Sequence, residues 1–211
     1  MRNHGKSDAS WDRWDVDENA DIVISILTEL GISKCNIVGW SMGSAVAMSV
    51  AKRNKSIVNK LVLITPFSWL GGAVYNDKLA FKIFVSFVRI RERLFPNFNP
   101  KSKFSFLRKS NAINDEYTEW AWNNLHKSKD DFIYADGGRF VVPYDARPWI
   151  ENIEAETLVI TGGKDKLVPE ETSNDVVSRL KNVKVKTFPD AGHSVPWTHE
   201  NELLNELKEF F

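Results

Sequence analysis

The sequence predicts a parallel α/β sheet of about four strands, flanked by helices and interrupted by one long insertion. Two runs, Lys60 to Thr65 (KLVLIT) and Thr157 to Thr161 (TLVIT), are continuously apolar. Continuous apolar runs are typical of strands covered on both faces of a parallel sheet. Helical patterns alternate with the strands, and this alternation builds right-handed β-α-β units.

The first helix is expected over Glu18 to Leu30, which begins with acidic residues that suit the positive end of a helix dipole. Its apolar residues are Ile22, Ile24, Ile26, Leu27 and Leu30, and Gly31 is expected to end it. A short β-prone run, Asn36 to Val38, follows. It leads into the small residues of Ser44 to Ala51, which predict a buried helix.

The C-terminal part repeats the alternation of strand and helix. Asn182 to Phe188 (NVKVKTF) alternates apolar and polar residues, which is typical of an edge strand with one wet face. Helices are expected over Pro169 to Leu180 and over Glu200 to Phe211. Both follow a predicted strand, as a β-α-β arrangement requires.

About 85 residues, Pro66 to Asn152, separate the two apolar strands, and they carry helical patterns at Lys78 to Leu94 and Asp115 to His126. A connection of this size with helices of its own is better explained as a cap than as a loop. We therefore expect a core formed by residues 1–65 and 153–211, with a helical cap or lid over residues 66–152.

Composition limits the partners. Among 211 residues, Lys+Arg and Asp+Glu both number 28, so no net charge draws the chain to nucleic acid, and we expect a small-molecule substrate. A single cysteine, Cys35, excludes an intramolecular disulfide. No apolar run approaches the ~18 residues of a membrane span, and the first 20 residues do not resemble a signal peptide. These features predict a cytoplasmic protein.

The segment GWSMG places Gly39, Ser41 and Gly43 directly between a predicted strand and a predicted helix. A sharp strand-to-helix turn uses glycines because the backbone and the helix approach closely there. In such a turn the Ser41 hydroxyl projects above the sheet near the positive helix N-terminus. The pattern alone is weak, so its weight comes from this position.

A serine hydroxyl becomes a nucleophile only when a base removes its proton, and the base needs an acid to orient it. Asp165 follows the strand TLVIT, and His193 follows the strand NVKVKTF. Both therefore lie at the carboxyl ends of strands, where parallel sheets place reactive groups. The order Ser, Asp, His on three separate loops predicts a catalytic triad.

These residues resemble the α/β-hydrolase superfamily. The matching segments are RNHGKSD (Arg2 to Asp8), VGWSMGSA (Val38 to Ala45), LVITGGKDKLVP (Leu158 to Pro169) and AGHSVPWTHENELLNELKEFF (Ala191 to Phe211). The resemblance implies that Ser41 is the nucleophile, His193 the general base and then acid, and Asp165 its orienting carboxylate. It also implies that the Met42 amide donates to the oxyanion.

The resemblance further implies a serine hydrolase that cleaves a small, fairly apolar carboxylic ester or related acyl compound through an acyl-enzyme, with no metal or organic cofactor. Lactonase, C–C bond hydrolase, acyltransferase and cofactor-free haloperoxidase activities use the same triad. The sequence does not choose among these activities.

Eight tryptophans are many for this length. Trp40 precedes the predicted nucleophile, Trp197 follows the predicted base, and Trp69 lies at the start of the insertion. They are candidates for an aromatic pocket around an apolar acyl or ring group. Ordinary core packing is an equally good explanation for each one singly.

The remaining titratable residues have simpler explanations. We expect a surface or capping role for His199, a structural role for His4 and no metal site at His126. An acidic group precedes the first helix, and helix capping with solvation explains it better than paired catalytic carboxylates; its members are Asp12, Asp15, Asp17 and Glu18.

In the resembled family, the segment like RNHGKSD follows the fourth strand of an order 1-2-4-3-5-6-7-8. The sequence here has no counterpart of the first four strands or of the loop that donates the second oxyanion amide. The simplest expectation is a fragment of a longer hydrolase, whose upstream part could carry a signal peptide. The strand before Ser41 then becomes an exposed edge open to self-association. A truncated, catalytically impaired protein that binds a ligand or partner is the alternative function.

Overall fold

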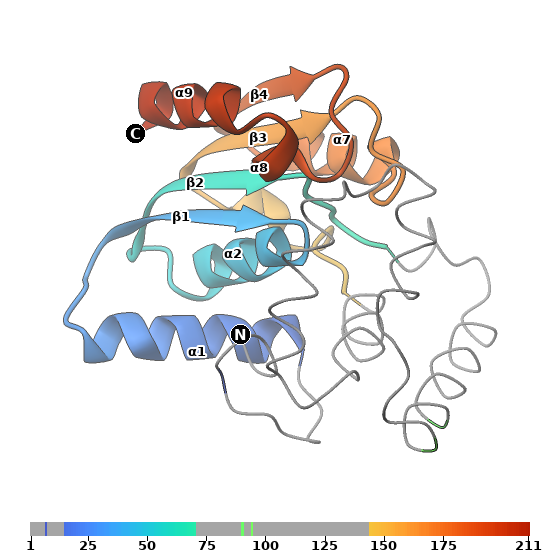
Figure 1. Cartoon of the computed structure of the whole chain (residues 1–211). Helices are drawn as coiled ribbons and strands as arrows, with labels where there is room; N and C mark the ends of the chain where they lie inside the picture. Colours follow the sequence, from blue (N-terminus) through green and yellow to red (C-terminus); the bar gives the residue numbers. More distant parts are fainter. Residues whose placement is uncertain (1–6, 8–14, 71–89, 91–93, 95–143) are drawn as a thin grey trace.

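A computed structural model describes residues 7, 15–70, 90, 94 and 144–211 (Figure 1). Within these ranges four strands alternate with helices along the chain. In order, the elements are α1 (Val16–Glu29), β1 (Cys35–Trp40), α2 (Met42–Arg53), β2 (Val58–Ile64), η2 (Ile150–Asn152), β3 (Glu156–Gly162), α7 (Glu170–Arg179), β4 (Val183–Phe188), α8 (Val195–Thr198) and α9 (Glu200–Phe210).

The four strands form one parallel sheet in the order β1-β2-β3-β4, so their spatial order is their order in the sequence. In Figure 1 all four arrows point the same way, and the loops that follow them gather at one end of the sheet. β2 and β3 pair in register from Lys60 with Glu156 to Ile64 with Ile160, although about 90 residues separate them in sequence. The predicted parallel α/β sheet is confirmed.

The apolar strands β2 and β3 bury side chains on both faces. Leu61, Leu63 and Val159 point into a core shared with α1, α2, η2 and α7. The alternate residues of the same strands point to the opposite face of the sheet, into a second core covered by α8 and α9. On β2 and β3 these residues are Val62, Ile64, Leu158 and Ile160. A run without polar alternation therefore reflects helices on both sides of the sheet.

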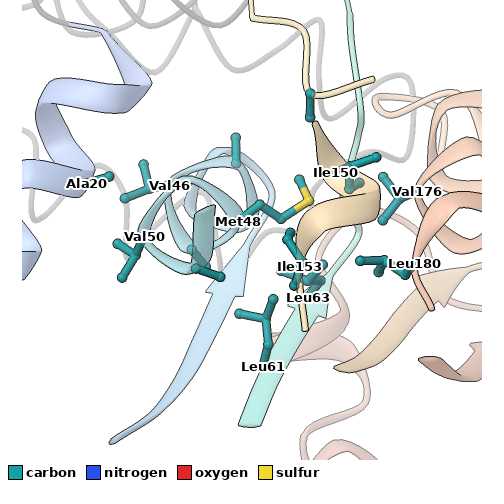
Figure 2. Close-up of a cluster of buried hydrophobic side chains, with 14 of the residues drawn as sticks. Ala20, Val46, Met48, Val50, Leu61, Leu63, Ile150, Ile153, Val176 and Leu180 are labelled. Atoms are coloured by element: carbon teal, nitrogen blue, oxygen red, sulfur yellow. The ribbon is translucent and has the colours of Figure 1, made fainter. Parts of the chain in front are cut away.

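The larger core centres on α2. Figure 2 shows Met48 of α2 reaching between β2 and the segment that carries Ile150 and Ile153, and each of these three side chains is 1% exposed or less. The small residues predicted to form a buried helix do so, because all eight residues from 44 to 51 are buried. Small side chains let α2 lie close to the sheet.

Helix α1 begins at a capping box. The Asp15 carboxylate accepts the Glu18 amide at 2.7 Å, and the Glu18 carboxylate accepts the Asp15 amide at 3.1 Å. Gly31 follows the helix with a φ of 68°, a value that favours glycine. The capping explanation for this acidic group is confirmed at Asp15 and Glu18, whereas Asp12 lies outside the described residues.

The buried face of α1 differs from the expected one. Val16, Asn19 and Ala20 are buried against α2, and Val23, Ile24 and Leu27 pack beside them. Three of the apolar residues that predicted the helix are instead exposed on its flank, namely Ile22, Ile26 and Leu30. Ala20 is fully buried in the core that α1 shares with α2, a placement that apolar spacing alone does not reveal.

The described ends of the predicted insertion pack with the core. Phe67, Ala146 and Ile150 are each 1% exposed or less, and Trp69 pairs with Asp145 in an isolated antiparallel bridge. Within the predicted cap helices, only Ile90 and Leu94 are described, and both are helical. The remainder of the predicted cap, including Asp115 to His126, lies outside the described residues.

Strands β1 and β4 lie at the two edges of the described sheet. The edge position predicted for β4 is confirmed, and its residues are mostly half-buried or exposed. On β1, the Val38 side chain is 48% exposed. Self-association through β1 stays a prediction. In the parts of the chain that the structure describes, no helix is both long and apolar enough to span a bilayer.

Candidate active site

Ser41 stands at the turn between β1 and α2. Its φ of 52° lies in the left-handed region, which a residue with a Cβ adopts at an energetic cost. The Ser41 amide donates to the Ile64 carbonyl at 2.9 Å, so the last rung of the β1–β2 ladder holds the turn. The buried Ser44 hydroxyl donates to the same carbonyl and to that of Gly39. A strained, well-bonded turn thus carries the serine.

The two glycines of GWSMG differ in what they permit. A Cβ on Gly39 would lie 2.6 Å from the Gly43 carbonyl carbon, 2.8 Å from the Ser44 Cα and closer still to the Gly43 oxygen. A Cβ on Gly43 would meet nothing within 4 Å among the described residues. The expected close approach of strand and helix therefore requires glycine at position 39, and no described atom requires it at position 43.

His193 connects Ser41 to Asp165. Its Nε2 lies 2.9 Å from the Ser41 hydroxyl oxygen, and its Nδ1 lies 2.8 Å from Asp165 Oδ2. The His193 and Asp165 side chains are only 2% and 7% exposed. A carboxylate only accepts hydrogen bonds, so Nδ1 carries the proton and Nε2 is free to accept one from the serine.

Asp165 is fixed by its own loop. Its Oδ1 accepts the backbone amides of Leu167 at 2.8 Å and Val168 at 3.0 Å, which leaves Oδ2 to face His193. The two carboxylate oxygens therefore have separate tasks. One holds the loop after β3, and the other orients the imidazole.

Two further glycines let the loops of Asp165 and His193 pack directly on each other. A Cβ on Gly162 would lie 2.7 Å from the Ala191 oxygen, and one on Gly163 would lie 2.6 Å from the Pro189 oxygen. Two backbone bonds join the same loops, from the Gly163 amide to the Phe188 carbonyl and from the Lys164 amide to the Ala191 carbonyl. The sequence segment GGKD thus sets the distance between acid and base.

Met42 is the first residue of α2, directly after Ser41. The first amides of a helix have no partner within the helix, and they carry the positive end of its dipole. The Met42 amide is thus a helix N-terminal donor that directly follows Ser41 in the chain, and its role at an oxyanion stays a prediction.

The structure brings one of the three tryptophan candidates, Trp40, to His193 and a second, Trp197, to Trp40. The Trp40 indole N–H donates to the His193 carbonyl at 3.0 Å, and its ring centroid lies 5.4 Å from that of His193. Trp197 packs edge-on against Trp40 at 4.7 Å. Trp69 contacts Arg147 instead, whose guanidinium lies 4.5 Å from its ring centroid.

The other histidines do not join this set. His199 stands at the N-cap position of α9, but its side chain makes no capping hydrogen bond and is only 14% exposed, so neither the capping nor the surface role expected for this side chain is found; its Nε2 lies 3.2 Å from Asp190 Oδ1. A backbone hydrogen bond and His199 hold the pKa of Asp190 below its usual value. His4 and His126 lie outside the described residues. Over the described ranges, no group of three or more His, Cys, Asp or Glu side chains could hold a metal ion.

Thr65 is a residue that the sequence pattern did not single out. It follows Ile64, and Ile64 pairs with Trp40, so Thr65 ends β2 beside Ser41. Its φ is 47°, which is an outlier for a β-branched residue. Its hydroxyl is buried and has no hydrogen-bond partner among the described residues. Strain and an unpaired polar atom therefore coincide next to the candidate nucleophile.

Thr65→Gly is expected to raise the free energy of unfolding by roughly 1 to 3 kcal/mol. Glycine removes a conformational cost of about 1–3 kcal/mol and an unpaired hydroxyl worth about 1–3 kcal/mol. Against these gains stand about 0.5–1 kcal/mol of added chain entropy and about 1–2 kcal/mol for the lost burial of the Thr65 methyl group, so the middle of the combined range is about 2 kcal/mol. Urea denaturation measures the change. Thr65→Val keeps the strained backbone and should recover only the hydroxyl part, and a Thr65→Gly variant less stable than wild type would contradict the estimate.

A parallel sheet with a serine at a strand-to-helix turn, hydrogen-bonded through a histidine to an aspartate, defines the class of α/β folds built around a Ser-His-Asp arrangement. The family model for the alpha/beta hydrolase fold matches residues 1–200. The chain therefore belongs to the alpha/beta hydrolase fold family, as its sequence motifs predicted.

Two relatives show which proteins the chain is similar to. It is 28% identical over 192 residues to a 2-hydroxy-6-oxo-6-phenylhexa-2,4-dienoate hydrolase of Burkholderia cepacia, with 86% of this chain and 64% of that protein covered. It is 27% identical over 219 residues to the bifunctional esterase/perhydrolase DCH of Acinetobacter calcoaceticus, with 99% and 78% covered. The chain thus spans less than two thirds of the first relative's length.

Solved structures share the fold. The esterase EaEST from Exiguobacterium antarcticum aligns with a TM-score of 0.80 at 20% identity, over 99% of this chain and 78% of that chain. The enol-lactonase from Burkholderia xenovorans LB400 aligns with a TM-score of 0.75 at 18% identity, over 100% and 78%. At these identities the likeness concerns the fold.

Proposed function

We propose that the chain is a serine hydrolase that cleaves a small, fairly apolar carboxylic ester or related acyl compound. The observation that carries this proposal is the continuous hydrogen-bonded path from Ser41 Oγ through both nitrogens of His193 to Asp165. The named relatives, which are hydrolases, support the same reaction type.

In the proposed reaction, Ser41 Oγ attacks the acyl carbon while its proton passes to His193 Nε2. Asp165 stabilises the imidazolium that forms. The Met42 amide donates to the oxyanion of the tetrahedral intermediate. His193 then gives the proton to the leaving alkoxide, which departs and leaves an ester on Ser41.

Water completes the cycle by the same route. It loses a proton to His193 Nε2 as it attacks the acyl-enzyme, and the proton returns to Ser41 when the carboxylic acid leaves. Every proton transferred has a side chain of this chain to receive it, so the proposed reaction needs no metal or organic cofactor. The Trp40 ring beside His193, together with Trp197 packed on Trp40, favours an apolar acyl group.

A fluorophosphonate probe tests the proposal. It should label the folded chain at Ser41, as located by peptide mass spectrometry, and Ser41→Ala should remain unlabelled. The chain should also hydrolyse p-nitrophenyl acetate faster than Ser41→Ala. Absence of labelling, together with equal background rates for the two proteins, would support the impaired ligand- or partner-binding alternative instead.

Hydrolysis of a C–C bond is a second candidate, and a specific observation favours it. The Burkholderia cepacia relative is named for hydrolysis of a 6-oxo-dienoate, a name that contains no ester. Comparing rates on p-nitrophenyl acetate and on 2-hydroxy-6-oxo-6-phenylhexa-2,4-dienoate separates the two. A kcat/KM for the dienoate at least tenfold above that for the ester would favour the C–C bond reaction.

A further inference from the structure

One contact outside the Ser-His-Asp path joins the same two segments. The Trp40 indole N–H donates to the backbone carbonyl of His193 at 3.0 Å, from 153 positions away in sequence. Trp40 is the last residue of β1 and is bonded covalently to Ser41. Two consecutive residues, the last of β1 and the first of the turn after it, therefore contact His193 at two points, Trp40 at its carbonyl and Ser41 at its ring nitrogen.

We propose that Trp40 is a positioning residue that fixes the backbone of His193 so that Nε2 faces Ser41 Oγ. This inference rests on the proposed function, in which His193 is the base. The contacts form a closed ring: the peptide bond from Trp40 to Ser41, the hydrogen bond from Ser41 to His193, and the bond from the Trp40 indole to the His193 carbonyl. A closed ring restrains both the position and the direction of the imidazole.

The restraint spans the sheet. β1 and the loop that follows β4 are separated by β2 and β3, so no strand pairing joins Trp40 to His193 directly. The loop after β4 instead brings the His193 carbonyl to within 3.0 Å of the Trp40 indole nitrogen at the end of β1. The Trp40 side chain therefore links the backbone of His193 to the residue next to Ser41. This link adds to the restraint from the sheet, which holds both loops.

The indole is itself held in place. Trp40 packs against the core that α8 and α9 cover, its ring lies tilted at 41° to the His193 ring, and the edge of Trp197 of α8 contacts it at 4.7 Å. A tryptophan restrained on these sides cannot turn its N–H away without opening the packing. The Trp40 donor is thus preorganised.

Positioning and pocket-wall roles predict different kinetics. If Trp40 mainly bounds the acyl pocket, its replacement raises KM. If it positions His193, its replacement lowers kcat, because a misplacement of about 1 Å in a catalytic group costs on the order of 10²-fold in rate. The Trp40→Phe variant retains an aromatic ring and removes the N–H, so it separates the two roles.

We expect Trp40→Phe to lower kcat for p-nitrophenyl acetate by about 10- to 100-fold, with KM changed less than about threefold. Trp149→Phe is the matched control, because Trp149 is a half-buried tryptophan that packs against the other core and contacts Lys52 and Tyr144. It should change kcat less than about twofold. A Trp40→Phe variant with wild-type kcat, or with its loss confined to KM, overturns the inference.

A second readout does not depend on turnover. In the folded wild type, the Trp40 indole proton should exchange slowly with deuterated solvent, and the Nδ1 proton of His193 should give a sharp downfield resonance that broadens in Trp40→Phe. If the His193 resonance is unchanged in Trp40→Phe, the inference is wrong, whether or not the wild type hydrolyses an ester. If the wild type hydrolyses no ester but the resonance broadens as expected, only the proposed function is wrong.

Should Trp40→Phe fail to fold, benzothienylalanine at position 40 is the second variant. It keeps the shape of the indole and replaces the N–H with sulphur. The same loss of kcat and the same broadening of the His193 resonance are expected, and wild-type behaviour of this variant overturns the inference.

Discussion

Asp165→Asn is expected to lower kcat by about 10³- to 10⁴-fold while the chain stays folded. The reason is that the two carboxylate oxygens of Asp165 bind different partners. Oδ1 accepts two backbone amides, from Leu167 and Val168. An amide NH₂ cannot accept these bonds, so the asparagine oxygen takes the place of Oδ1 and the NH₂ faces His193 Nδ1.

With an NH₂ at that position, Nδ1 must accept and the imidazole proton moves to Nε2. Nε2 then has no lone pair with which to take the Ser41 proton, and the base is lost without any change in shape. Steady-state kinetics with p-nitrophenyl acetate measure the effect, and circular dichroism reports the fold.

Asp190→Asn is the matched control for this change. Asp190 also contacts a histidine, His199, through a carboxylate oxygen at 3.2 Å, but its side chain is 72% exposed. The control should leave kcat within about twofold of wild type. If Asp165→Asn retained more than about a tenth of the wild-type kcat, the assignment of Asp165 as the orienting acid would be wrong.

Gly39→Ala is expected to destabilise the chain by more than about 3 kcal/mol or to prevent its folding. The new methyl group would enter the space of the Gly43 carbonyl and the Ser44 Cα. Both atoms belong to the backbone of the first turn of α2, so no side-chain rotation relieves the overlap. The turn that carries Ser41 would have to open.

Gly43→Ala tests whether the loss of stability depends on where in the turn the glycine is replaced. The same methyl group two residues past Ser41 meets no described atom within 4 Å, and alanine is the better helix former by about 1 kcal/mol. The variant should therefore be at least as stable as wild type in urea denaturation. Equal destabilisation by the two substitutions would contradict the proposed steric difference.

The strands and the loops that carry Ser41, Asp165 and His193 could be predicted because local sequence determines them, whereas the order of the strands followed only from the family resemblance. Continuous apolar runs reveal a strand that is buried on both faces, and a reactive residue directly after such a strand must lie at the carboxyl edge of the sheet. The predicted residues Ser41, Asp165 and His193 are brought together in the structure at 2.8–2.9 Å. Their catalytic roles stay predictions.

Features that depend on distant contacts could not be predicted. The bond from Trp40 to His193 joins residues 153 positions apart, and a Trp before a serine does not show which way its indole turns. The unpaired hydroxyl of Thr65 likewise depends on its surroundings in three dimensions. A glycine at position 65 would have indicated a positive φ, but a threonine gives no such indication in the sequence.

The bridge between Trp69 and Asp145 has a consequence for how this fold can diversify. The Arg147 guanidinium donates to both oxygens of Asp145 and lies over the Trp69 ring, so Trp69 and Asp145 are held together by a backbone bridge and by a shared arginine. Chain entropy changes only slowly with the length of a closed loop. Because Trp69 and Asp145 are held together, we expect changes in the number of residues between them to cost little additional free energy at the described sheet and at the Ser41 turn.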